Sequence, residues 1–147
     1  MPIMKSEVIQ VRKEKSNRLP TPLFRWVEHE LYNYDWSKEE LKRLKEEIIL
    51  KSPERFVGSN RAITDQTGIK VIKLSTNMRI INLERKLSAI EESLKRPIFA
   101  ELFEYKYRKC LPWQQVIVEM NISESTYKRI RRNLVKDIAI RLGEWIE

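Results

Sequence analysis

Apolar positions recur along this chain mostly at intervals of three and four residues, the spacing of one face of an α-helix. The first such segment is PLFRWVEHELYNY, which is broken at Asp35 and Trp36. A second follows at once, with Ser37 and Glu40 in the spacing of a capping box. These patterns predict a pair of antiparallel helices over residues 21–52.

The middle of the chain combines an irregular stretch with a long periodic one. Residues 53–68 show no clear period and predict an irregular loop. From residue 69 onward one long helix is predicted, with Leu74 and Ile81 on a flanking ridge. Its main apolar positions are Ile80, Leu83, Leu87, Ile90 and Leu94. The spacing is heptad-like but too short to argue a coiled coil. Packing within the monomer and a homodimer seam both remain open.

The last third of the chain reads as helix, short turn, helix. Pro97 opens PIFAELFEYKYRK, an amphipathic helix whose aromatic residues we expect to fill the core. Pro112 then suits the first turn of a helix that stops at Asn121, a residue tolerant of left-handed geometry. Ile122 can plug the turn, and Ser123 is a good N-cap for the next helix. This order predicts a helix-turn-helix unit.

The helix predicted after Ser123 carries its basic residues on one face and its apolar residues on the other. In a projection at 100° per residue, four cations fall within about 60° of Ser125. They are Lys128, Arg129, Arg132 and Lys136, hereafter the basic stripe. Tyr127, Ile130, Leu134, Ile138 and Trp145 cluster on the opposite side. A helix of this kind can enter the major groove of DNA, where residues of its first turns reach base edges.

Roles in DNA binding follow from these positions. Ser125, Lys128, Arg129 and Arg132 are the candidates for base readout, with the two arginines first because their planar fork pairs with guanine. Arg131 and Lys136 lie on the flank or farther along, where phosphate contacts are expected. Gln114 and Gln115 of the preceding helix can also donate to phosphates. The alternative is a solvated charged face.

The amino-acid composition narrows both the fold class and the class of function. Three glycines argue against a turn-rich β protein, so we expect an all-α helical bundle with a long central helix and a C-terminal helix-turn-helix within residues 69–147. Cys110 is the only cysteine and His29 the only histidine, and neither belongs to a metal-ligand pattern. No phosphate-binding loop or nucleophile elbow occurs. We expect no enzyme activity, no cofactor and no metal.

The net charge of +8 favours an anionic partner, either nucleic acid or an acidic membrane surface. A membrane-surface helix would leave its apolar face free, whereas here the preceding helix can cover it. No apolar run approaches the ~18 residues that span a bilayer, and the first residues lack a signal-peptide hydrophobic region. We therefore expect a cytoplasmic protein that binds double-stranded DNA. Residues 1–20 are predicted as a mobile basic arm, either a phosphate contact or a solvated tail.

The stretch NISESTYKRIRRNLVKDIAIRLG resembles the end of the RinA-like and ArpU-like phage transcriptional regulators. The matching positions are Ile122, Ser123, Thr126, Arg129, Ile130, Arg132, Leu142 and Gly143. Region 4 of sigma factors carries related helix-turn-helix units. The resemblance implies an activator of phage or prophage late genes that acts in a bacterial host and contacts RNA polymerase. The full set of predicted DNA-binding residues is Gln114, Gln115, Ser123, Ser125, Thr126, Lys128, Arg129, Arg131, Arg132 and Lys136.

Two other functions fit the same features. A phage small terminase subunit is also basic, helical and DNA-binding, but it works in packaging and forms rings. A sigma-like adaptor would act mainly through protein contacts and bind DNA weakly alone. Mass in solution and a DNA-binding assay separate these alternatives from the regulator.

Overall fold

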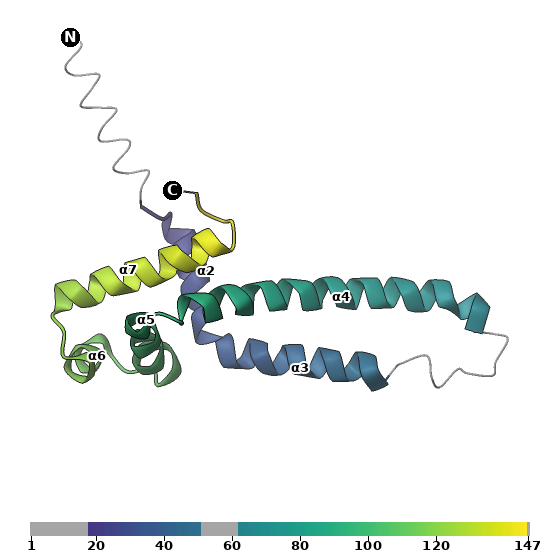
Figure 1. Ribbon diagram of the computed structural model, residues 1–147, viewed down its shortest axis with the longest axis horizontal. Helices are drawn as coiled ribbons and strands as arrows, with labels where there is room; N and C mark the ends of the chain where they lie inside the picture. The colour runs from purple at the N-terminus through teal and green to yellow at the C-terminus, as the bar shows by residue number, and fades with distance from the viewer. Residues whose placement is uncertain (1–17, 51–61, 147) are drawn as a thin grey trace, which may run out of the picture. The chain divides into compact units, whose positions relative to one another are not determined.

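The structure, a computed structural model, describes residues 18–50 and 62–146, with the backbone alone over residues 62–76. Every regular element in these ranges is a helix, which confirms the predicted all-α class (Figure 1). None of these helices is long and apolar enough to cross a membrane. The predicted arm of residues 1–20 lies outside the described residues except for its last three positions.

The helices form two compact units. The hairpin unit spans residues 33–91 and contains α3 (Tyr34–Leu50) and most of α4 (Ala62–Ser93). The C-terminal unit combines α2 (Thr21–Tyr32) with everything from Glu92 onward: α5 (Pro97–Leu102), η2 (Phe103–Arg108), α6 (Trp113–Met120) and α7 (Glu124–Arg141).

In the hairpin unit α3 and α4 run antiparallel (Figure 1). The Tyr34 hydroxyl donates a hydrogen bond of 2.9 Å to the Glu91 carboxylate near one end. Farther along α3, Lys45 Nζ lies 2.8 Å from Glu84 Oε1. Polar contacts therefore fix the register of the two helices at both positions.

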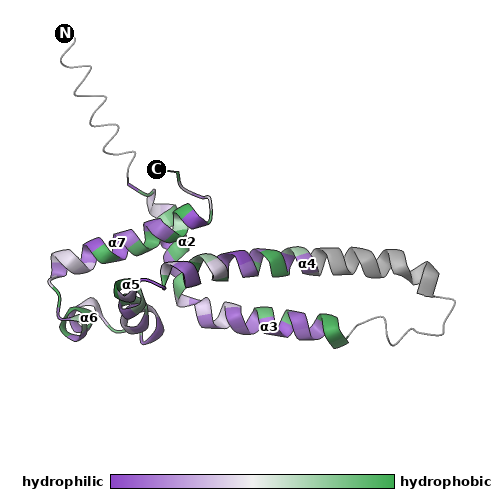
Figure 2. Ribbon diagram, viewed as in Figure 1, coloured by the Kyte–Doolittle hydropathy of each residue, from purple (hydrophilic) through white to green (hydrophobic). Residues whose placement is uncertain are grey.

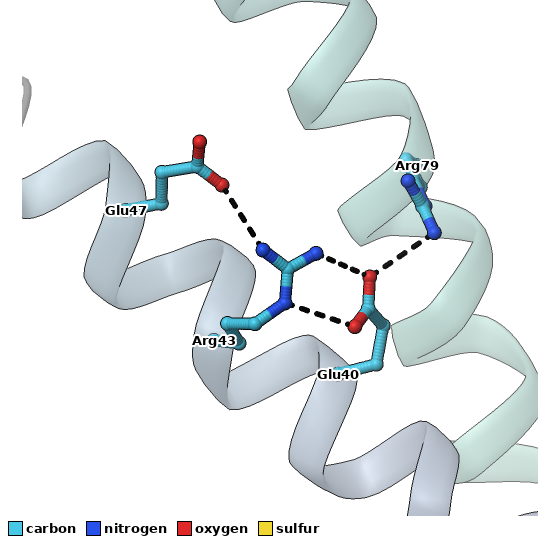
Figure 3. Close-up of polar contacts among 4 residues, drawn as sticks. All are labelled: Glu40, Arg43, Glu47 and Arg79. Atoms are coloured by element: carbon cyan, nitrogen blue, oxygen red, sulfur yellow. Dashed lines mark hydrogen bonds and ion pairs between the residues drawn. The ribbon is translucent and has the colours of Figure 1, made fainter.

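Glu40 is the centre of a second polar cluster between these helices (Figure 3). Its carboxylate accepts from Arg43 at 2.8 Å on the same helix and from Arg79 of α4 at 3.0 Å. Arg43 also lies 3.6 Å from Glu47. The hydrogen bond from Arg43 lowers the pKa of the Glu40 carboxyl. Glu40 thus links α3 to α4 and does not cap a helix.

The predicted helical pair over residues 21–52 is wrong in two respects. Only Asn33 separates α2 from α3, so the chain continues as helix through the predicted break at Asp35 and Trp36. Ser37 lies buried inside α3, and its backbone N–H donates to the Asn33 carbonyl at 2.8 Å. In addition, α2 and α3 belong to different units. A capping-box spacing also occurs inside helices, and here the helical pattern of its neighbours prevails.

The long helix begins earlier than predicted. α4 starts at Ala62, so residues 62–68 of the expected loop are helical, whereas residues 53–61 lie outside the described residues. Ile80, Leu87 and Ile90 are buried within the single chain, which favours packing in the monomer over a dimer seam. Ile81 of the flanking ridge is 59% exposed, and the side chain of Leu74 is not described.

The C-terminal unit has a continuous apolar core. The predicted helix from Pro97 forms, but its second half is the π-helix η2, a wider form with hydrogen bonds from residue i+5 to residue i. Phe99, Phe103 and Tyr107 are buried, which confirms the predicted core role for these three aromatic residues, whereas Tyr105 is half-buried. The rings of Phe103 and Tyr107 stack with centroids 6.3 Å apart.

Candidate nucleic-acid interface

α6 ends as the sequence predicts, at a left-handed asparagine. Asn121 has φ 53° and ψ 51°, and its N–H donates to the Val118 carbonyl at 3.2 Å. The N–H of Ile122 donates to the Ile117 carbonyl at 3.1 Å. These two bonds are those of a Schellman motif, which satisfies carbonyls left open at a helix end. Asparagine tolerates this conformation better than other residues with a side chain.

Ser123 begins α7, also as predicted. Its backbone is extended, and its hydroxyl oxygen accepts from the Thr126 N–H at 3.2 Å. Glu124 follows in the first turn, where its carboxylate suits the positive helix end. Ile122 is half-buried in the turn between. Residues 121–123 therefore join α6 to α7 by a three-residue turn, the connection expected of a helix-turn-helix.

The two faces of α7 match the projection except at Trp145, which lies beyond the end of α7 at Arg141. Ser125, Lys128, Arg129 and Arg132 are exposed and Lys136 is half-buried, whereas Tyr127, Ile130, Leu134 and Ile138 are buried. Figure 2 shows the resulting alternation of polar and apolar residues along α7. Val135 and Ala139, which were not predicted for the core, are also fully buried. The second half of α7 is therefore enclosed over a wider arc than the first half.

α2 lies across α7 and contacts it, as α5 and α6 also do (Figure 1). Val27 and Leu31 of α2 are fully buried. Because α2 covers a flank of α7 and the preceding helices cover its apolar face, only the first half of α7 keeps a broad exposed surface. Reading of base edges by a helix uses this same N-terminal half.

Arg131 differs from the other basic residues and corrects a prediction. Its Nε donates to Glu28 Oε2 at 2.9 Å and its Nη2 donates to Glu28 Oε1. The guanidinium also lies over the ring of Phe24, 5.0 Å from the centroid. Both partners belong to α2. Arg131 thus makes a bidentate contact inside the protein, and we no longer assign it a phosphate contact.

Glu28 is a buried carboxylate that accepts three hydrogen bonds. Tyr107 Oη donates to Glu28 Oε2 at 2.6 Å, in addition to the two bonds from Arg131. Burial opposes ionisation, but the hydrogen bonds from Arg131 and Tyr107 outweigh it and lower the pKa of Glu28. The same contact raises the pKa of Arg131, and burial next to Glu28 raises that of Tyr107. Glu28 therefore stays charged at neutral pH.

A second polar contact holds the other end of α7. The Ser93 hydroxyl, which is fully buried, donates to Asp137 Oδ2 at 2.7 Å. Arg141 Nε donates to the same oxygen at 3.0 Å. Gly143, with φ 74°, follows the helix, and the Glu144 N–H donates to the Ala139 carbonyl at 3.0 Å. α7 is thus fixed by polar contacts near its middle and near its end.

The remaining predicted site residues lie on the outside of the helix-turn-helix. Lys128 Nζ is 3.2 Å from Glu124, and Arg132 Nε lies 3.4 Å from the Lys128 carbonyl. Among the described residues Arg129 has no side-chain partner. On α6, Gln114 is exposed and Gln115 Nε2 donates to Glu119 at 3.0 Å. These contacts are exposed and exchangeable, so the outward cations remain available to a ligand.

Sequence reasoning missed Glu28, Tyr107, Ser93 and Asp137. Their partners are 44 to 103 residues away in the chain, so no local spacing connects them. A weak signal exists for Glu28, which follows buried Val27 on an amphipathic helix. Within the described residues no group of histidine, cysteine, aspartate and glutamate side chains is arranged to hold a metal.

The chain matches a known protein family. A family model described as "Protein of unknown function (DUF722)" covers residues 27–140. The chain belongs to this family. The matched span runs from α2 to the end of α7 and includes Glu28, Arg131 and the basic stripe. Neither the curated proteins nor the solved structures that were compared gave a match.

Proposed function

We propose that this protein is a sequence-specific DNA-binding transcriptional regulator that inserts α7 into the major groove. The observation that carries the proposal is the separation of polar side chains on α7. Those that point inward have partners inside the protein, whereas Lys128, Arg129 and Arg132 of the basic stripe are exposed on a capped helix after a three-residue turn. An isolated solvated helix has no need of this separation.

The dimensions of the site agree with this role. An α-helix with its side chains is about 10–12 Å across, and the major groove is about 12 Å wide. Arg129 and Arg132 lie in the exposed first half of α7 and are the candidates for bidentate contacts to guanine. Lys136 lies one turn beyond Arg132 and is placed for a phosphate. Gln114, at the start of α6, is a further phosphate donor.

The resemblance to the RinA-like and ArpU-like regulators supports a finer proposal, activation of phage or prophage late genes together with host RNA polymerase. The small terminase subunit and the sigma-like adaptor remain its competitors. A ring of many subunits in solution supports the terminase, and weak DNA binding alone supports the adaptor. A monomer or dimer that selects one site from random duplexes supports the regulator.

The residues of the basic stripe can be tested by comparing stability with binding. Arg129→Ala and Arg132→Ala should change stability by less than about 0.5 kcal/mol because both side chains are exposed. Each should lose about 1–3 kcal/mol of affinity for the selected site and relax the preference at one position. Lys136→Ala should weaken binding to all duplexes about equally. Melting curves and binding isotherms on the same proteins measure both properties.

Arg108→Ala is the control, since it removes the same charge from an exposed side chain at the end of η2 that pairs with Glu104. It should bind as the parent protein does. If Arg129→Ala and Arg132→Ala melt normally and also bind every duplex as the parent does, the basic stripe is a solvated face and the proposed function is wrong.

A further inference from the structure

Three arginines lie within a four-residue stretch of α7, and one of them differs in its exposure and contacts. Arg129 and Arg132 are exposed, whereas the side chain of Arg131 is only 34% exposed. Two of its N–H groups are directed at Glu28, and Phe24 lies against its guanidinium. On the projection Arg131 falls on a flank of the basic stripe, about 120° from Ser125. A long cation at a flank is well placed for the DNA backbone unless something holds it back.

The contact is stronger than an ordinary surface ion pair. Glu28 itself is 9% exposed, and Tyr107 donates a third hydrogen bond to it from η2. A bidentate arginine–carboxylate pair adds geometric specificity to charge. Glu28 and Arg131 are 103 residues apart in the chain, so the pair also joins α2 to α7.

We propose that Glu28 masks Arg131 from DNA, so that α2 acts as the third helix of the DNA-binding unit and withholds one positive charge from the backbone. The mask rests on the proposed function. Contacts to phosphates carry no sequence information, and each one strengthens binding to every duplex alike. Withholding Arg131 therefore lowers non-specific affinity and leaves base readout to the residues of the basic stripe.

The number of phosphates neutralised is measurable from the dependence of affinity on salt. For duplex DNA the slope of log affinity against log salt changes by about 0.9 for each phosphate contact. Lys136→Gln, which removes the proposed phosphate contact of the basic stripe, should make the slope shallower by about that amount. Arg131→Gln should leave the slope unchanged. Glu28→Gln should free Arg131 and make the slope steeper by about 0.9.

The double variant Glu28→Gln/Arg131→Gln tests whether Arg131 contacts DNA even if a single variant unfolds. Removing one partner leaves an unpaired charge in a partly buried place, whereas removing both charges together avoids that cost. The double variant should fold, as circular dichroism can verify, and should bind random-sequence duplex with the parent slope. Lys45→Met in the hairpin unit serves as a control for the loss of one distant charge.

The outcomes separate the two proposals. If the double variant loses about 0.9 in slope while Lys136→Gln loses a similar amount, Arg131 is a DNA contact and the mask is wrong. If Lys136→Gln and the double variant keep the parent slope, and Arg129→Gln and Arg132→Gln keep the parent affinity for every duplex, α7 does not meet DNA, and both proposals are wrong. A parent slope in the double variant, together with a shallower slope in Lys136→Gln, supports the mask.

Discussion

The hairpin unit and the C-terminal unit are both built from amphipathic helices, but they place their charges differently. α3 carries four basic and five acidic residues, and its charges pair across to α4 in the exposed pair Lys45–Glu84 and at Glu40, whose side chain is only 10% exposed. α7 carries six basic and two acidic residues. In the C-terminal unit the polar contacts between helices are buried or half-buried, and they leave most of the cations of α7 outside.

The difference separates two uses of charge. In the hairpin unit opposite charges meet along two neighbouring helices, so they set the register and leave little net field. In the C-terminal unit apolar packing and two inward polar contacts hold α7, and the exposed cations of its first half take no part in the contacts between helices. Exposed positive charge of this kind is available to an anionic ligand. The comparison can be tested by asking how each unit responds when one contact is removed.

The largest effect is expected in the core under α7. Leu134 is fully buried, and Leu134→Ala should cost about 2–5 kcal/mol of stability because it leaves a cavity that surrounding helices cannot fill. Leu44→Ala in α3 also removes a buried side chain, but a two-helix pair can close around it more easily, so the loss should lie near the lower limit.

Hydrogen exchange measured by mass spectrometry can follow the two units separately. Leu134→Ala should raise exchange in α2, α6 and α7, and Leu44→Ala should raise it in α3 and α4. Val118→Ala is the control, since that side chain is 70% exposed. If both variants raise hydrogen exchange equally in all described helices, the two units unfold as one.

Local signals in the sequence predicted much of the helix-turn-helix. Asn121 and Ser123 act within a few residues of themselves, so their roles as helix end and N-cap could be read without the fold. The sorting of α7 was predictable for the same reason, since period and face are local properties. The arrangement of the cations on the outside is thus predicted and observed; their contact with DNA stays a prediction.

Contacts between distant segments could not be predicted. The projection places Arg131 on a flank of α7, but nothing near it in the sequence shows that its partner is Glu28 on α2. The π-helical form of η2 was not predicted either. The predicted start of α3 was misplaced because Ser37 and Glu40 have the spacing of a capping box, whereas the helical pattern continues through both residues.

An intermediate effect is expected on acidification, through Glu28. Because the pKa of this carboxyl is lowered in the folded protein, its contribution is complete above the ordinary value of 4.5 and is lost as pH falls below it. Arg131, Tyr107 and Lys106 face the group and favour its charged form. Protonation should remove on the order of 1–2 kcal/mol, since hydrogen bonds to charged groups contribute about 1.5–3 kcal/mol.

Melting temperatures between pH 7 and pH 3 measure this loss. The parent should lose stability more steeply below pH 4.5 than Glu28→Gln, which has no proton to take up at this position. Glu91→Gln supplies a control that removes a carboxylate from the hairpin unit. Parallel curves for the parent and Glu28→Gln would show that Glu28 does not contribute to acid sensitivity.

The smallest effect is expected where the hairpin unit has its exposed charges. The side chains of Lys45 and Glu84 are 52% and 46% exposed, and water screens their attraction. A double-mutant cycle of Lys45→Met, Glu84→Gln and the combined variant should give a coupling of about 0.2–1 kcal/mol in dilute buffer. In 0.5 M salt, where the screening length is only a few Å, the coupling should fall toward zero. Urea unfolding of the four proteins measures it. A coupling that stays above about 1 kcal/mol in high salt would mean that the surface pairs of the hairpin unit stabilise it as buried contacts do, and the contrast would then rest on the charge balance of α3 and α7 alone.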